Sequence, residues 1–160
     1  MTLDKLFATN ASTRNLALRL VLAATILPHG LQKLLGWFGG YGFTGTMGWF
    51  VSKDIPAPIA FLVIVAESFG ALAIALGLVT RAAAAGLVLV MLGAIFMVHL
   101  PNGFFMNWFG NQAGEGFEYF LPVLAIASLL VVEGAGRASV DRFLAELLAK
   151  KAHAPALAVR

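Results

Sequence analysis

The hydrophobic residues of this chain gather in four long stretches that are separated by shorter polar or glycine-rich connections. The stretches run over about residues 15–35, 58–79, 82–100 and 117–136. Each is close to the ~20 residues that a helix needs to cross the hydrocarbon core of a bilayer. Leu, Ala, Val, Ile and Gly follow one another without the period-two alternation of a barrel strand. The pattern therefore predicts an all-α integral membrane protein, a bundle of four antiparallel transmembrane helices.

The composition excludes the other broad classes of protein. The chain has 160 residues, enough for one domain, and 60% of them are hydrophobic while 12% are charged. An average soluble domain carries about 25% charged residues, and a domain this small cannot bury so much apolar surface. This balance excludes a disordered chain, an ordinary soluble globule and a nucleic-acid binder.

The use of cysteine and histidine limits the chemistry. The chain has no cysteine, so it can form neither a disulfide nor a thiolate metal site. Its histidines, His29, His99 and His153, are too scattered for a two-histidine zinc motif. We therefore expect no metal site, and any electron chemistry must use a bound cofactor, a bound substrate or a partner.

The distribution of Lys and Arg predicts the orientation of the helices. If the N-terminus is inside, the inner segments collect Lys5, Arg14, Arg81, Arg137, Arg142, Lys150, Lys151 and Arg160. The outer connections hold only Lys53, with Lys33 at a helix end. Because cytoplasmic loops are enriched in Lys and Arg, both termini are expected in the cytoplasm, and the reversed topology is the alternative. From Asp141 onward the tail is typical of an amphipathic basic helix that rests on anionic lipid.

The two outer connections are rich in aromatic residues. Thirteen of the 18 aromatic side chains fall in residues 36–50 and 101–120, whereas the inner side is nearly bare of them. One interpretation is an interfacial belt of aromatic residues. The other is that both connections fold over the bundle and line a flat apolar ligand site, with Trp49, Phe104 and Trp108 as ligand contacts.

Two connections carry local predictions. The link at residues 79–81 is very short, so the second and third helices should form an antiparallel hairpin. In the first outer connection, a glycine-rich run gives way to larger apolar residues, and we expect a short interfacial helix near Thr46 to Ser52.

Charged side chains inside the predicted spans mark the candidate site, because charge is costly in a membrane. Glu67 lies near the middle of the second span, so it must be paired, protonated or in contact with water. Two interpretations stay open, a structural pair with a cation of the bundle and a proton acceptor or ligand anchor. His29 and Lys33, spaced i, i+4 on the first helix, are the candidate partners of Glu67.

Further polar residues reach a similar depth near the outer side, and we expect them to converge with Glu67 under the aromatic connections. The catalytic candidates are Glu67, His29 and His99, and the ligand-binding candidates are Lys33, Asn102 and Glu118. Near the inner side, a structural ion pair between Arg19 and Glu133 is expected to clasp the first and fourth helices.

Several short motifs keep a particular order and spacing over the four spans. They are Leu18-Arg19-Leu20, His29-Gly30 with Lys33, Glu67, Gly70, Gly77, Thr80-Arg81-Ala82-Ala83, His99, Asn102-Gly103-Phe104-Phe105, Gly116-Phe117-Glu118-Tyr119, Gly134, Gly136, Ser139 and Asp141. In this order they resemble the DoxX family of membrane proteins. The resemblance covers about residues 15–141, a four-helix DoxX-like transmembrane domain. It leaves residues 1–14 as a cytoplasmic N-terminal segment and 142–160 as a basic cytoplasmic tail.

The resemblance implies a multi-pass protein of the bacterial inner membrane. Some members of this family are linked to thiosulfate:quinone oxidoreductase, and others to membrane-associated redox or oxidative-stress complexes. The resemblance brings no established catalytic residue. It implies the lipid bilayer and a membrane or extracytoplasmic redox protein as partners, and a second copy of the chain is a further candidate.

Three functions are compatible with these residues. The first is a quinone-linked redox subunit, in which the aromatic connections form a slot for the quinone, His29 or His99 donates to its oxygens, and Glu67 exchanges protons. The second is a non-enzymatic scaffold or accessory subunit that holds a redox partner. The third is a b-type cytochrome with His29 and His99 as axial ligands. Quinone is thus the candidate cofactor of the leading hypothesis.

Overall fold

The computed structural model describes residues 6–153, with side chains as far as Lys150, and this part of the chain is all-α without a strand. The α-helices are α2 (Thr13–Leu35), α3 (Gly42–Ser52), α4 (Ala57–Val65), α5 (Ala71–Leu76), α6 (Thr80–Ala94), α7 (Phe120–Glu133) and α8 (Val140–His153). Shorter helical segments are η1 (Trp37–Gly39), η2 (Ala66–Gly70), η3 (Ile95–His99) and η4 (Leu100–Asn102). The prediction of an all-α protein is confirmed for the described residues.

Two continuous helical segments are long and apolar enough to cross a membrane by length and composition. The segment α4–η2–α5 covers Ala57–Leu76, and the segment α6–η3–η4 covers Thr80–Asn102. Within them, η2 and η3 are π-helical turns, in which each turn of the backbone holds more residues than in an α-helix. These two segments correspond to the second and third predicted spans.

The other two predicted spans differ from these segments. Helix α2 has 23 residues, but charged side chains interrupt its apolar sequence. Helix α7 has 14 residues, about 21 Å at 1.5 Å per residue, so it is shorter than the apolar stretch 117–136. It ends at Glu133 because Gly134 follows with a positive φ of 83°, which stops the helix. That all four segments span a bilayer as one bundle stays a prediction.

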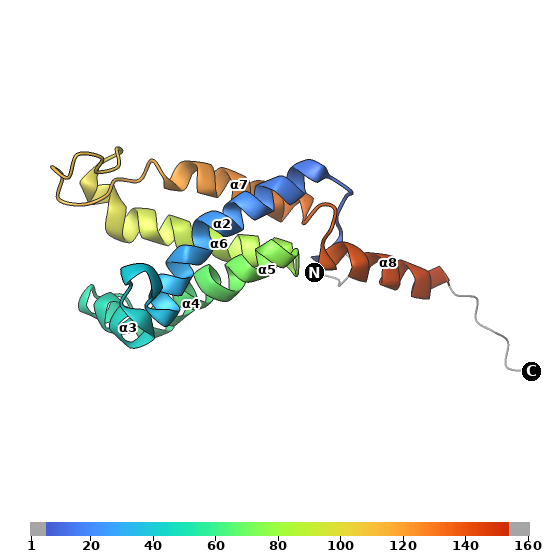
Figure 1. Ribbon diagram of the computed structural model, residues 1–160, viewed down its shortest axis with the longest axis horizontal. Coiled ribbons are helices and arrows are strands. Elements are labelled where there is room, and N and C mark those ends of the chain that lie inside the picture. The colour runs from blue at the N-terminus through green and yellow to red at the C-terminus, as the bar shows by residue number, and fades with distance from the viewer. Residues whose placement is uncertain (1–5, 154–160) are drawn as a thin grey trace, which may run out of the picture.

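The helices pack side by side around an aliphatic core. Helix α2 contacts α5, η2, α3 and α7, while α6 lies along α7. Fully buried aliphatic side chains at the centre are Leu22, Ile26, Ile74, Leu87 and Leu130. In Figure 1, α3 and the connection after η4 lie at one end of the molecule, and α8 leaves from the other end. This arrangement gives the molecule two chemically different ends.

The predicted hairpin and the predicted short helix are both present. The segments α4–η2–α5 and α6–η3–η4 are joined by three residues, 77–79, where Gly77 and Val79 have left-handed backbone conformations. Helix α3 contains the residues 46–52 that were expected to be helical, and it begins four residues earlier, at Gly42. Its Phe50 packs with Ile55 and Ala60 in a small second core, so this connection is folded against the bundle.

A single aspartate joins α8 to this hairpin. The carboxylate of Asp141 accepts hydrogen bonds from the backbone N–H groups of Val79 (2.6 Å) and Thr80 (2.9 Å). Its own N–H donates to the carbonyl of Gly77 (2.8 Å). The N–H groups of Val79 and Thr80 lie at the start of α6 and have no acceptor within that helix. Asp141 therefore caps the N-terminus of α6 from a distant part of the sequence.

The expected ion pair between Arg19 and Glu133 is not formed. The side chain of Arg19 is 2% exposed and donates to the backbone carbonyls of Ile74, Ala75 and Ala138. Glu133 pairs instead with Arg14, which lies at the exposed start of α2. The prediction failed because Arg19 is deep enough to reach the C-terminal carbonyls of α5, which have no partner within their helix.

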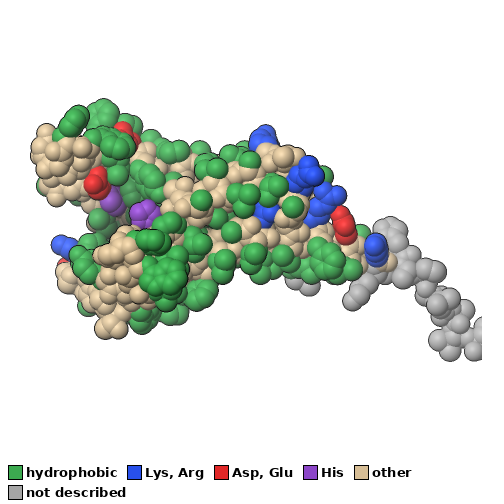
Figure 2. Space-filling view, in the orientation of Figure 1, with side chains coloured by type: hydrophobic (Ala, Val, Ile, Leu, Met, Phe, Trp, Pro, Cys, Tyr) green, Lys and Arg blue, Asp and Glu red, His purple; other side chains and the backbone are tan. Residues whose placement is uncertain are grey.

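The charged side chains are distributed unevenly along the molecule. Figure 2 shows Lys and Arg gathered near the end from which α8 leaves, while the opposite end is hollowed. This agrees with the predicted grouping of the described residues Arg14, Arg81, Arg137 and Arg142. Lys5 and Arg160 lie outside the described residues, as do the side chains of Lys151 and His153. The division into residues 1–14, 15–141 and 142–160 stays a prediction.

We expect Arg19→Gln to destabilise the protein strongly. Shortening the side chain removes the guanidinium that donates to the carbonyls of Ile74, Ala75 and Ala138, and hydrogen bonds to charged groups contribute about 1.5–3 kcal/mol each. The free energy of unfolding in detergent measures the effect. Arg14→Gln is the matched control, because it removes an exposed ion pair and should change this free energy much less. Equal stability of the two variants would contradict the assigned role of Arg19.

Candidate functional site

The hollowed end of the molecule contains a cavity of about 820 Å³. Its walls come from α2, α3, the α4–η2–α5 segment, the α6–η3–η4 segment, the connection after η4 and the start of α7. Most of the lining is aliphatic or aromatic, and the polar lining side chains are His29, Lys33, Glu67, His99, Glu115 and Tyr119. Histidine side chains are visible inside the hollow in Figure 2. The site therefore combines a large apolar surface with a few polar groups, as ligand pockets usually do.

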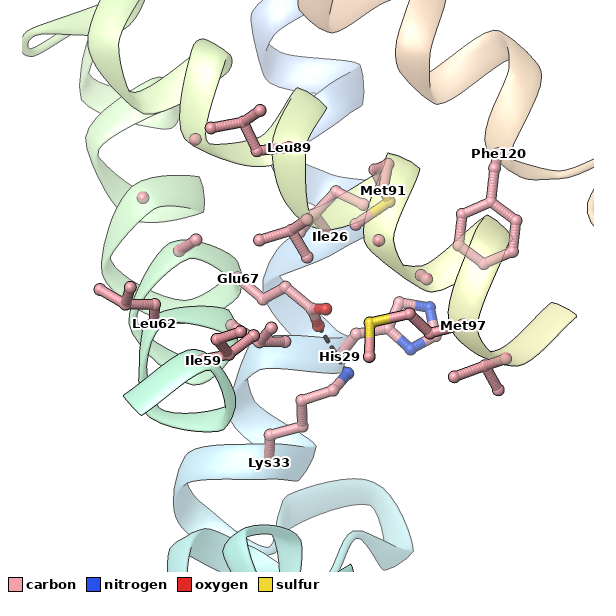
Figure 3. Close-up of a pocket in the computed structure, with 18 of the residues that line it drawn as sticks. Ile26, His29, Lys33, Ile59, Leu62, Glu67, Leu89, Met91, Met97 and Phe120 are labelled. Atoms are coloured by element: carbon pink, nitrogen blue, oxygen red, sulfur yellow. Dashed lines mark hydrogen bonds and ion pairs between the residues drawn. The ribbon is translucent and has the colours of Figure 1, made fainter. Parts of the chain in front are cut away.

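An ion pair lies at the centre of these polar groups. The Nζ atom of Lys33 is 2.6 Å from Oε2 of Glu67. In Figure 3 the two side chains point toward one another from α2 and η2, with His29 beside them. The side chain of Glu67 is 8% exposed and that of Lys33 is 25% exposed, so the pair connects a buried carboxylate to the open part of the cavity. Of the two expected partners of Glu67, the structure selects Lys33.

This pair depends on a close approach of two backbones. A Cβ atom at Gly30 would collide with the backbone carbonyl of Glu67, so only glycine fits at this crossing of α2 and η2. The hydroxyl of Ser68 donates to the carbonyl of Gly30 over 3.0 Å and fixes the contact. Because Lys33 follows Gly30 by about one helical turn, the crossing places its side chain next to Glu67.

His29 lies in the open part of the cavity. Its ring meets the ring of Tyr119 edge to face, with centroids 6.3 Å apart. The ring is exposed, and among the described residues it has no hydrogen bond. Both ring nitrogens of His29 are therefore available to a ligand.

His99 is held more firmly than His29. Its Nδ1 atom is 2.8 Å from the backbone carbonyl of Glu115, which also accepts a hydrogen bond from Nδ2 of Asn102 over 3.1 Å. The ring packs against Phe120 with centroids 4.5 Å apart. His99 ends η3, so each of the two π-helical turns carries one polar residue of the cavity. Such turns are frequent at functional sites.

Two of the expected site residues organise a loop instead of lining the cavity. Oε1 of Glu118 accepts from the backbone N–H of Met106 (3.1 Å) and from Nε1 of Trp108 (2.9 Å). Asn102 is occupied by the carbonyl of Glu115. The connection between η4 and α7 folds back on itself and uses the polar atoms of both residues internally. Glu118 and Asn102 thus hold the connection in shape and do not themselves line the cavity.

The aromatic candidates also separate into two groups. Trp49 lines the cavity from α3, as expected for a ligand contact. Phe104 and Trp108 do not line it, and the side chain of Trp108 is 76% exposed. Both connections therefore contribute to the site, the first through Trp49 and the second through residues other than the two expected aromatics.

The sequence interpretation missed two polar residues of the cavity. Tyr119 lines it, and its buried hydroxyl has no hydrogen-bond partner among the described residues. Glu115 also lines it, and its carbonyl holds His99. The position of Tyr119 next to Glu118, at the beginning of an apolar stretch, was the available signal. Within the described part of the chain, no group of three His, Cys, Asp or Glu residues is arranged to hold a metal ion.

Comparisons with known proteins give a consistent picture. The sequence model of the DoxX family matches residues 15–100, which cover most of α2, the whole first apolar segment and most of the second. A curated relative from Bacillus subtilis (strain 168), named "Putative oxidoreductase CatD", is 28% identical over 129 residues, or 81% of this chain and 85% of that protein. No solved structure matches the chain significantly.

We expect Gly30→Ala to damage the site through the backbone. The added methyl group would collide with the Glu67 carbonyl, and overpacking of this kind costs about 1–3 kcal/mol. The measured quantities are the free energy of unfolding and the distance between spin labels on α2 and α4. Gly86→Ala is the control, because open space surrounds that position in α6. Retention of wild-type stability and spacing by Gly30→Ala would refute the tight crossing.

Proposed function

The chain belongs to the DoxX family, and on that premise we propose that it is a membrane oxidoreductase subunit that binds a quinone in this cavity. The name of the Bacillus subtilis relative, an oxidoreductase, supports redox chemistry. The proposed subunit is of the thiosulfate:quinone oxidoreductase type, in which thiosulfate is the electron donor and the quinone is the acceptor. The observation that carries the proposal is the cavity itself, with a broad apolar lining and an ion pair at its polar end.

A quinone matches this combination of surfaces. Its ring is flat and apolar, which suits the walls formed by Phe120, Met91 and Trp49. Its two oxygen atoms need polar partners, and Lys33 and His29 can donate hydrogen bonds at the polar end of the cavity. The volume of about 820 Å³ falls in the range of about 300–1,000 Å³ that is typical of small-molecule sites.

The ion pair offers a path for protons as well as a binding contact. Reduction of a quinone to its hydroquinone consumes two protons with two electrons, so a site for it needs a proton donor near the ring oxygens. Glu67 is buried, whereas its partner Lys33 reaches the open part of the cavity. The Lys33 ammonium can give a proton to a ring oxygen, and the Glu67 carboxylate beside it can take up a proton and pass it to Lys33, which is the role that we assign to Glu67.

The same proposal includes a position in the bacterial inner membrane. The two apolar segments of 20 and 23 residues supply spans, and α2 and α7 complete a four-helix bundle around the core. Arg142 lies in α8 and Arg81 donates to carbonyls at the end of α7, whereas Lys53 follows α3 at the opposite end of the molecule (Figure 1). By the bias of Lys and Arg toward the cytoplasm, both termini face the cytoplasm and the cavity opens near the outer surface.

The first experiment measures quinone binding through Trp49. In a variant with Trp37→Phe and Trp108→Phe, Trp49 is the remaining tryptophan, and a short-chain quinone should quench its fluorescence saturably. A variant that keeps Trp108 instead is the matched control, because that side chain is exposed and outside the cavity. Equal, unsaturable quenching of both would contradict the site. A Soret band in the purified protein would instead support the b-type cytochrome.

Glu67→Gln then separates binding from chemistry. The substitution keeps the shape of the side chain and its ability to form hydrogen bonds but removes its titratable charge. With a proton-carrying role, quinone-dependent turnover should fall by about 100-fold while the fold is retained, since general acid–base groups contribute 10²–10⁴-fold. Glu133→Gln at the far end should leave turnover unchanged. Quinone binding without any turnover by the wild-type chain would indicate the non-enzymatic accessory subunit.

We expect the topology to follow the charge distribution. Reporters inserted near Arg81 and after α8 should be active only on the cytoplasmic side, and reporters near Lys53 and Asn111 only on the outer side. Thiol labelling of single cysteines at the same four positions is an independent measurement, because the chain has no cysteine of its own. Cytoplasmic labelling at Asn111 would reverse the orientation and place the cavity at the inner surface.

A further inference from the structure

We infer that the cavity holds its ligand through a ring hydroxyl that donates to Nε2 of His99, so that it selects a phenol or hydroquinone over the corresponding carbonyl or ether. This inference deepens the proposed quinone site and rests on it for the class of ring. It adds that the site prefers the hydroxyl form of the ring to the carbonyl form, and that His99 is the residue that distinguishes the two.

The hydrogen bond on the far side of the imidazole fixes its tautomer. The carbonyl of Glu115 can only accept, so Nδ1 of His99, 2.8 Å away, must carry the hydrogen atom. In a neutral imidazole the second nitrogen then has no hydrogen and acts as an acceptor. No hydrogen bond to Nε2 comes from any described residue. His99 therefore presents the cavity with an acceptor that lacks a donor.

The surroundings of His99 hold this acceptor in place. The carbonyl of Glu115 is fixed by Asn102, and Oε2 of Glu115 accepts from the backbone N–H of Asn107 over 2.6 Å. Phe120 packs against the imidazole ring. Gly116 allows the loop to close, because a Cβ atom there would collide with the carbonyl of Phe105. The tautomer and the direction of the ring are thus set before a ligand arrives.

The opposite side of the cavity has the complementary character. Lys33 on α2 can only donate, and its partner Glu67 occupies part of its capacity. A hydroquinone carries two hydroxyl groups, so one can donate to Nε2 of His99 while the oxygen of the other accepts from Lys33. If a quinone carbonyl or an ether oxygen lay next to Nε2, both atoms would be acceptors and no hydrogen bond could form between them. Polar groups left without a partner in this way lower affinity.

The wild-type comparison uses two probes, of which one has a hydroxyl donor and the other has a methyl group in place of its hydrogen atom. Trimethylphenol and its methyl ether, trimethylanisole, have nearly the same shape, and neither undergoes quinone redox cycling. Titration calorimetry with the full chain in lipid nanodiscs, corrected with empty nanodiscs for partitioning, gives both affinities. We expect the phenol to bind about tenfold more tightly, which corresponds to one hydrogen bond of about 1.4 kcal/mol.

Two substitutions then locate the discrimination. In His99→Asn the amide can still reach the Glu115 carbonyl, but nothing replaces Nε2, so the preference for phenol should be lost. In His99→Gln the amide oxygen can take the place of Nε2, so part of the preference should return. Thermal unfolding of each variant shows that it is folded. A structural role alone would change stability without separating these two variants in their selectivity.

The outcomes distinguish this inference from the proposed function. Equal binding of phenol and ether by the wild type would overturn it, and so would an unchanged preference in His99→Asn. If quinone still quenches Trp49 in either case, the proposed quinone site stands without it. If the phenol preference depends on His99 but no quinone binds or turns over, the hydroxyl site stands and the redox proposal fails.

Discussion

The crossing of α2 and η2 at Gly30 is the constraint on which the rest of the site depends. Because no side chain separates the two backbones there, the helices approach closely enough for Lys33 to reach Glu67. The hydroxyl of Ser68 satisfies the Gly30 carbonyl at the same point. A buried carboxylate in an apolar bundle needs a partner of opposite charge. The close packing of the two backbones is what brings Lys33 near enough to compensate the charge of Glu67.

The cavity exists because its polar wall is built by elements that deviate from regular helix. Glu67 lies in η2 and His99 ends η3, each within a longer helical segment that is otherwise apolar. A regular α-helix would place successive side chains along fixed rows. The π-helical turns shift that register locally, and each shift accompanies a polar side chain that lines the cavity. The apolar remainder of both segments keeps the packing that supports them.

The sequence allowed the helical class and the hairpin to be predicted, and it limited the expected partners of Glu67 to His29 and Lys33, because each follows from periodicity, link length or depth along a span. Depth alone was insufficient for Glu118 and Asn102, whose polar atoms the folded loop uses internally. It also failed for Arg19, which satisfies backbone carbonyls that no sequence pattern marks. The orphan hydroxyl of Tyr119 likewise depends on tertiary packing, which the order of residues does not reveal.

Asp141 gives the C-terminal helix a mechanical connection to the site. Its carboxylate grips the first N–H groups of α6, and that helix continues without a break to His99 and Asn102. At 1.5 Å per residue this segment of 23 residues is about 35 Å long. The contact with α8 at one end of the molecule and a wall of the cavity at the other end therefore belong to one helical segment.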